Sequence, residues 1–87
     1  MELGEPASYL TLTEGTAVYA SGGERVGRVS EVVAAPEQDI FEGIAISPHL
    51  GVGQRRFAAA DQIAAIGEEG VLLSLSKDAC ESLPAPR

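Results

Sequence analysis

The sequence predicts an all-β fold, a small β-barrel with one short C-terminal helix. Its Val-, Ile- and Leu-rich segments are short, and glycine-containing turns separate them at intervals of about 8–12 residues, which is typical of barrels and sandwiches. No long segment between them has the helical period that a parallel βαβ sheet requires. The 87 residues are enough for one domain and not for two.

Large apolar side chains for a core are scarce. Aromatic residues make up 5% of the chain, and they are Tyr9, Tyr19, Phe41 and Phe57. The core must therefore consist mainly of Val, Ile, Leu and Ala. We expect no deep, aromatic-lined pocket and no cofactor.

The charge of the chain excludes several partners. Thirteen acidic residues against six basic ones give a formal net charge of −7, which disfavours direct binding of nucleic acid and docking on anionic lipid. No apolar run reaches the roughly 18–20 residues of a membrane span, and the acidic N-terminus lacks the apolar centre of a signal peptide. Because the single cysteine, Cys80, cannot form an intrachain disulfide, we expect a cytoplasmic protein.

The chain is expected to form a single barrel domain over residues 9–83. Residues 1–8 carry Gly, Pro and two Glu and are predicted to be a flexible lead-in, and residues 84–87 are predicted to be a tail. Within the domain, residues 9–12 are rich in β-formers and predict a short first strand, and residues 16–20 predict a second.

A hairpin turn is predicted at residues 21–24, because paired glycines supply the positive φ angles of tight turns. The strand that follows, residues 25–34, contains four valines. Val26 and Val29 have opposite parity, and Gly27 lies between them. This slip indicates a bulge or bend of a curved sheet.

Residues 36–39 predict a polar turn before a strand over residues 40–47. The core face of this strand is expected to carry Ile40, Ile44 and Ile46. Glu42 shares that face and is therefore expected near an exposed end. The following elements are a loop (47–53), a strand (54–58), a turn (59–62), a short apolar segment (63–66), a turn (68–70) and a strand (71–75).

A short helix is predicted after the last strand. Ser76 is a favourable N-cap, and Asp78 in the first turn suits the helix dipole. Ala79 and Leu83 are four residues apart, so they should face the barrel together before Pro84 ends the helix.

The order and spacing of these segments resemble the PRC-barrel domain family. The matching segments are residues 15–19 (GTAVY), 23–33 (GERVGRVSEVV), 42–46 (EGIAI), 60–63 (ADQI) and 66–73 (IGEEGVLL). The family often has a proline before the Ala-Asp pair, where this chain has Ala59. The chain looks like a free-standing bacterial member.

The resemblance implies a barrel that binds or scaffolds other molecules. The family occurs in the photosynthetic reaction-centre H subunit and in the C-terminal half of a ribosome maturation factor, and as free-standing bacterial and archaeal proteins. It has no shared catalytic motif, so the resemblance implies no catalytic residue.

The residues that could carry catalysis form no established motif. His49, the only histidine, could be combined with Ser47 and Asp61 into a triad, but the G-x-S-x-G elbow and an oxyanion loop are missing. We interpret His49 as a surface residue, since it also has no Cys or His companion at zinc-binding spacing. Cys80 is expected to be a small, buried apolar side chain.

Two further patterns predict no bound ion or phosphate. The acidic pairs Glu37/Asp39 and Glu68/Glu69 could bind Ca²⁺ weakly, but they lack the EF-hand pattern and are interpreted as solvated turns. The glycines of residues 51–53 lack the remainder of a phosphate loop and indicate a flexible connection. We expect no metal site.

The best cluster for binding a partner combines basic and aromatic residues. The candidate partner-binding residues are Arg55, Arg56, Phe57 and His49. On a strand, Arg55 and Phe57 share one face. Arg25 and Arg28 join the cluster if the barrel brings their strands together. These arginines either balance neighbouring glutamates or anchor a protein partner, since Arg is enriched at interface hot spots.

The sequence thus predicts a non-catalytic binding or scaffold module for protein–protein interaction, not an enzyme. A homodimer is expected, because the exposed strand edges of small open barrels can pair across a two-fold axis. The alternative is an RNA-processing or ribosome-associated accessory factor, by analogy with the maturation factor. Direct contact with nucleic acid is disfavoured by the acidity of the chain.

Overall fold

Turn residues divide the chain into short strands, as predicted. The computed structural model describes residues 2–49 and 53–86, and within them the chain forms six strands, three 3-10 turns and one short α-helix. The strands are β1 (Ala17–Tyr19), β2 (Arg25–Ala35), β3 (Ile40–Pro48), β4 (Arg56–Ala59), β5 (Ile63–Gly67) and β6 (Gly70–Leu73). The helical elements are η1 (Tyr9–Thr11), η2 (Pro36–Gln38), η3 (Ala60–Gln62) and α1 (Lys77–Cys80).

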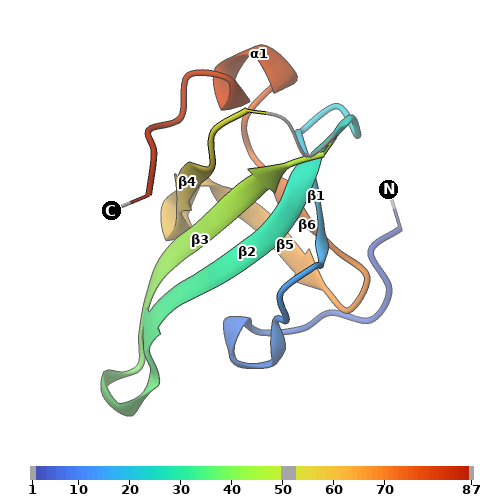
Figure 1. Cartoon of the computed structure of the whole chain (residues 1–87). Helices are drawn as coiled ribbons and strands as arrows, with labels where there is room; N and C mark the ends of the chain where they lie inside the picture. Colours follow the sequence, from blue (N-terminus) through green and yellow to red (C-terminus); the bar gives the residue numbers. More distant parts are fainter. Residues whose placement is uncertain (1, 50–52, 87) are drawn as a thin grey trace.

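The strands form one mixed sheet in the order β4-β3-β2-β1-β6-β5. Neighbours are antiparallel, except that β1 and β6 are parallel. The sheet curls into a half-barrel, with α1 beside its open side (Figure 1). The predicted all-β fold with a short C-terminal helix is confirmed. The predicted strand over residues 54–58 is shifted, because β4 begins at Arg56. Of the predicted loop over residues 47–53, residues 50–52 lie outside the described residues.

The β1–β2 hairpin has the predicted turn, in which Gly23 adopts a φ of 93°. The register shifts between Val18 and Tyr19, whose partners are Gly27 and Arg25, so Val26 is the extra residue of a bulge. The slip in the valine pattern therefore has the predicted cause. At Gly27 a Cβ would lie against the carbonyl oxygen of Ser47 on β3, so only glycine fits this approach of two strands.

The prediction that Ile40 belongs to the core face of β3 is wrong. Ala34 pairs with Phe41 and Val33 pairs with Gly43, so Glu42 is an extra residue and the pleat reverses there. Phe41 packs against the core, whereas the Ile40 side chain is 44% exposed. Beyond the bulge, Ile44 and Ile46 are buried as expected.

The predicted first strand over residues 9–12 is also wrong, because these residues contain η1. The hydroxyl oxygen of Ser8 accepts a hydrogen bond from the Leu10 N–H at 3.2 Å and caps the turn. The Tyr9 ring stacks on Phe41, with ring centroids 4.8 Å apart and planes 5° apart. The stacking of Tyr9 on Phe41 stabilises η1, whereas the β-propensity of residues 9–12 stabilises no strand, because no other strand lies beside them to pair with.

The N-terminal residues, predicted to be a loose lead-in, lie along the outer edge of β5. Pro6 forms an isolated antiparallel bridge with Gly67. Three backbone hydrogen bonds continue the contact: Ala7 N–H to Ile66 at 2.9 Å, Glu68 N–H to Glu5 at 3.0 Å and Glu69 N–H to Leu3 at 2.8 Å. At these positions the β5 edge is already paired, so it is not open to a second chain.

The C-terminal residues cover the open side of the half-barrel. Ser76 caps α1 as predicted, since its hydroxyl oxygen accepts from the Ala79 N–H at 3.2 Å. Ala79 is exposed, however, and Cys80 and Leu83 are the side chains that enter the core. The reason is that α1 ends at Cys80, so the four-residue spacing from Ala79 does not apply.

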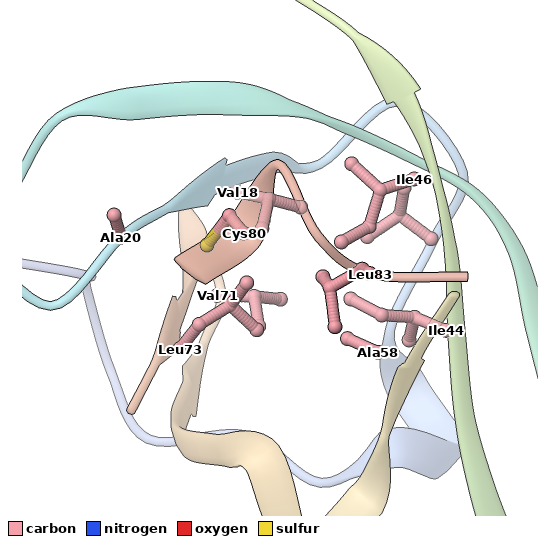
Figure 2. Close-up of a cluster of buried hydrophobic side chains, with 10 residues drawn as sticks. Val18, Ala20, Ile44, Ile46, Ala58, Val71, Leu73, Cys80 and Leu83 are labelled. Carbon is pink, nitrogen blue, oxygen red and sulfur yellow. The ribbon is translucent and has the colours of Figure 1, made fainter. Parts of the chain in front are cut away.

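The core is made almost entirely of small and medium aliphatic side chains, as the composition predicts. Figure 2 shows them converging from the sheet and from the C-terminal segment. The buried members are Val18, Ala20, Val29, Ile44, Ile46, Ala58, Val71, Leu73, Cys80 and Leu83.

We predict that Gly27→Ala lowers the free energy of unfolding by about 1–3 kcal/mol, the usual range for overpacking, because the new methyl group meets backbone that cannot move aside. Gly22→Ala is the matched control. There the new methyl group meets only the end of the Glu24 side chain, which can rotate away. Urea unfolding of both variants measures the difference, and equal midpoints would contradict the close approach of β2 and β3.

Candidate functional site

A hollow of about 140 Å³ lies where α1 meets the beginning of β2 and β4 and the end of β3, and we call it the α1 hollow. Its apolar lining consists of Val26, Ile46, Cys80 and Leu83. Its charged lining consists of Arg25, Arg56, Lys77 and Glu81. It therefore combines an apolar surface with three cationic side chains in a chain that is strongly acidic overall.

The apolar lining is set by the sheet and the C-terminal segment together. Val26 faces the core side because it is the extra residue of the first β2 bulge. Ile46 is buried on β3 directly after the Glu42 bulge has set the pleat. Cys80 and Leu83 are 4% and 8% exposed, so they close the hollow from the side of α1.

The three cations come from three different elements. Arg25 is the first residue of β2, and its Nε donates a hydrogen bond to the Gly27 carbonyl at 2.8 Å. Arg56 is the first residue of β4 and is half-buried. Lys77 is the first residue of α1 and is exposed. Each cation is therefore the first residue of its strand or helix, a position that leaves room for a long side chain.

Arg56 attaches the C-terminal segment to the sheet. One guanidinium nitrogen donates to the Glu81 carbonyl and to the Leu83 carbonyl, the latter at 3.3 Å. These carbonyls follow the end of α1, where the helix itself provides no partner. Beside them the Phe57 N–H donates to the Pro84 carbonyl at 2.7 Å, which extends the β4 edge by one backbone contact.

Cys80 is buried, as predicted. Burial raises the pKa of its thiol, the Glu24 carboxylate raises it further, and Arg56 only partly opposes them. The thiol is therefore protonated at neutral pH, which makes it a poor nucleophile.

The predicted partner-binding residues do not form one cluster in the structure. Arg56 lines the α1 hollow, together with Arg25, as the sequence suggested for strands brought together. Arg55 precedes β4 and donates to the Ser30 hydroxyl at 3.3 Å. The Phe57 ring lies against Gly43 on β3. His49 is exposed in the turn after β3, outside the lining of the hollow.

Sequence reasoning missed Lys77 and Glu81 as site residues. The N-cap Ser76 correctly located the start of α1, but a cap signal does not say against which strands a helix packs. The Arg56 contacts, the hydrogen bond from Phe57 to Pro84 and the burial of Cys80 and Leu83 together bring α1 beside β2 and β3.

The size of the α1 hollow limits its chemistry. Cofactor and drug-sized ligand sites usually enclose about 300–1,000 Å³. At 140 Å³ the hollow compares with a cavity of about 150 Å³ that holds a benzene-sized group, so it suits one apolar side chain. Within residues 2–49 and 53–86, no three His, Cys, Asp or Glu side chains form a group that could hold a metal ion.

A curled, six-stranded mixed sheet of this size with one short C-terminal helix defines the class of small β-barrel domains. The family model of the PRC-barrel domain matches residues 5–79 of the 87 residues, and the chain belongs to that family. PRC-barrel domains are in general non-catalytic modules for interaction or scaffolding. No curated relative matches the chain. None of the helical segments in the described parts of the chain is long and apolar enough to cross a membrane.

We predict that Arg56→Ala loosens the C-terminal segment and exposes Cys80 more often. Hydrogen bonds from a charged group contribute about 1.5–3 kcal/mol when buried, and less at a half-exposed site such as this one. The reaction of Cys80 with a thiol reagent under native conditions should therefore become about fivefold to tenfold faster. Arg55→Ala is the matched control, since the Arg55 guanidinium donates to the Ser30 hydroxyl on β2 and not to the C-terminal segment as far as the structure describes it, and equal rates for the two variants would refute this role of Arg56.

Proposed function

We propose that this protein is a non-catalytic binding module for protein–protein interaction, and that the α1 hollow receives one apolar side chain from an acidic segment of the partner. The observation that carries the proposal is the combination of a small apolar lining with Arg25, Arg56 and Lys77 around it.

The dimensions of the hollow favour a protein partner over a small metabolite. Interfaces obtain much of their affinity from a few anchor side chains that fill fully desolvated pockets. Ile46, Cys80 and Leu83 offer such a surface, since each is less than 10% exposed yet borders the hollow. One Leu, Ile or Phe side chain buried there would contribute about 1.5–3 kcal/mol.

The charges favour an acidic partner segment. Three of the six basic residues of the chain line this one hollow. The Lys77 ammonium is exposed and can meet a carboxylate without losing an internal contact. Glu81 is the single acid in the lining, so the lining itself carries three positive charges and one negative charge, with the Glu24 carboxylate close enough to act on Cys80. Complementary charge mainly accelerates association and selects the partner.

The chemistry of the site supports binding without catalysis. The raised pKa of the Cys80 thiol keeps the nearest nucleophile protonated. The free, buried cysteine also fits the cytoplasm, which stays the predicted location.

An RNA- or ribosome-associated role is the second candidate, and one observation favours it. The basic residues described by the structure all lie near the α1 end, on the start of β2, before and at the start of β4, and on α1: Arg25, Arg28, Arg55, Arg56 and Lys77. The net charge of −7 opposes the neutralisation of phosphates that RNA binding needs.

A gel-shift titration at low salt should therefore show no saturable binding of single-stranded RNA in the micromolar range. Saturation there, lost on Arg28→Glu, would favour this role instead.

We predict that Lys77→Glu removes up to about 90% of the protein captured below saturation from an extract of the native organism by the immobilised full chain, because a lost charge contact of about 1.4 kcal/mol lowers affinity tenfold. The variant should fold, since an acid in the first turn suits the helix dipole. Arg55→Glu makes the same charge change outside the hollow and should retain capture. Loss with Arg55→Glu and not with Lys77→Glu would move the site to the Arg55 and Phe57 surface.

A further inference from the structure

We infer that the acidic segment received by the α1 hollow belongs to a second copy of this chain, whose β2–β3 hairpin tip supplies both the apolar side chain and the carboxylates. We call residues 36–40 (PEQDI) the hairpin tip. The inference rests on the proposed function of the hollow and names its partner.

The hairpin tip projects from the half-barrel. β1 pairs with β2 only up to Arg28, and β4 pairs with β3 only between Gly43 and Ile46. The remaining part of the hairpin, from Glu31 to Glu42, has no strand on either outer side. Figure 1 shows it extending away from the body of the molecule.

The tip carries one exposed large apolar side chain. The Glu42 bulge turns Phe41 inward and leaves Ile40 on the outer face, 44% exposed. In the described parts of the chain, Ile40 and Leu10 are the exposed large apolar residues. Leu10 lies on η1, whose Tyr9 hydroxyl donates a hydrogen bond to the Asp39 carboxylate at 3.3 Å, whereas Ile40 directly follows the tip acids in the chain.

Carboxylates precede Ile40 within the same turn. Glu37 and Asp39 are both exposed. No Lys or Arg occurs between Arg28 and Arg55, so the hairpin beyond Arg28 has no basic residue that could neutralise these two carboxylates. The tip is therefore an acidic turn with an apolar side chain at its end.

These features complement the α1 hollow. The hollow has room for a side chain of the size of Ile40, and Arg25, Arg56 and Lys77 can meet the carboxylates of Glu37 and Asp39. In Figure 1 the tip and α1 lie at opposite ends of the molecule, so a chain cannot fill its own hollow. The contact must be intermolecular and head to tail, which differs from strand-edge pairing across a two-fold axis.

The general repulsion between two chains of charge −7 limits the strength of this contact. At physiological ionic strength the Debye length is about 8 Å, so distant acids are screened while adjacent charges in the hollow still attract. The tip is small, so we expect a weak interface, below the roughly 1,200 Å² of stable complexes.

Sedimentation of the full chain at physiological salt, from micromolar to millimolar concentration, tests the inference. The wild-type chain should associate with rising concentration. Ile40→Ser and Lys77→Glu should each be monomeric, because one lacks the anchor and the other has a reversed charge in the hollow. An equimolar mixture should form a 1:1 dimer and nothing larger, since it offers one intact tip and one intact hollow per pair. Leu10→Ser, the matched control, should associate like wild type.

A wild-type chain that stays monomeric throughout, or association of Ile40→Ser equal to wild type, would overturn the inference. Far-ultraviolet circular dichroism shows whether each variant is folded. As a second measurement, Glu37→Lys combined with Lys77→Glu should restore association by exchanging the charges, and failure to do so would also count against it. The two failures are distinguishable. The proposed function fails if Lys77→Glu leaves the capture of every protein, this chain included, unchanged, whereas a monomeric wild-type chain whose capture of other proteins is lost on Lys77→Glu overturns only the inference.

Discussion

The open side of the half-barrel must be covered, and the rest of the structure depends on how the chain does so. β4 and β5 form the two edges of the sheet, and the aliphatic side chains of its inner face need a second layer. Cys80 and Leu83 supply that layer from the C-terminal segment, and Arg56 holds the segment through the carbonyls that follow α1. In a domain of 87 residues each buried large apolar side chain contributes about 1.5–3 kcal/mol, so this cover is a substantial part of a small core. At the α1 hollow the cover by the C-terminal segment is incomplete.

Bulges decide which side chains take part in the core and which are left for binding. Val26 and Glu42 are each an extra residue in a ladder, and each reverses the alternation of its strand. The first bulge brings Val26 to the hollow. The second bulge places Phe41 on the inner face in place of Ile40, and Phe41 stacks with Tyr9. The same irregularities that curve the sheet thus create both an apolar recess at one end and an apolar projection at the other.

Positive and negative charges are also distributed unevenly between the two ends of the molecule. The basic residues of the described chain lie at the α1 end, whereas the charged residues of the hairpin tip are the acids Glu37 and Asp39. Both terminal segments cover strand edges, the N-terminal residues at β5 and Pro84 at β4, which discourages unspecific strand pairing. The recognition that we propose for this PRC-barrel domain therefore uses side chains at the two ends of the molecule and does not use the β5 edge, which the N-terminal residues already pair.

Local pattern by itself determined the fold class, most strand positions, the β1–β2 hairpin, the Ser76 cap and the resemblance to the PRC-barrel family, because each depends on residues close together in the chain. It also identified Arg56 as a candidate, but could not distinguish it from Arg55. Only the tertiary structure decided that Arg56 contacts the C-terminal segment, that Ile40 points outward and that Tyr9 packs on Phe41 instead of forming a strand. The position of the bulge depends on the pairing of β2 with β3, in which the flanking partners are 7 and 10 positions apart. The cover of the sheet depends on contacts between residues 25 to 32 positions apart, which no local spacing encodes.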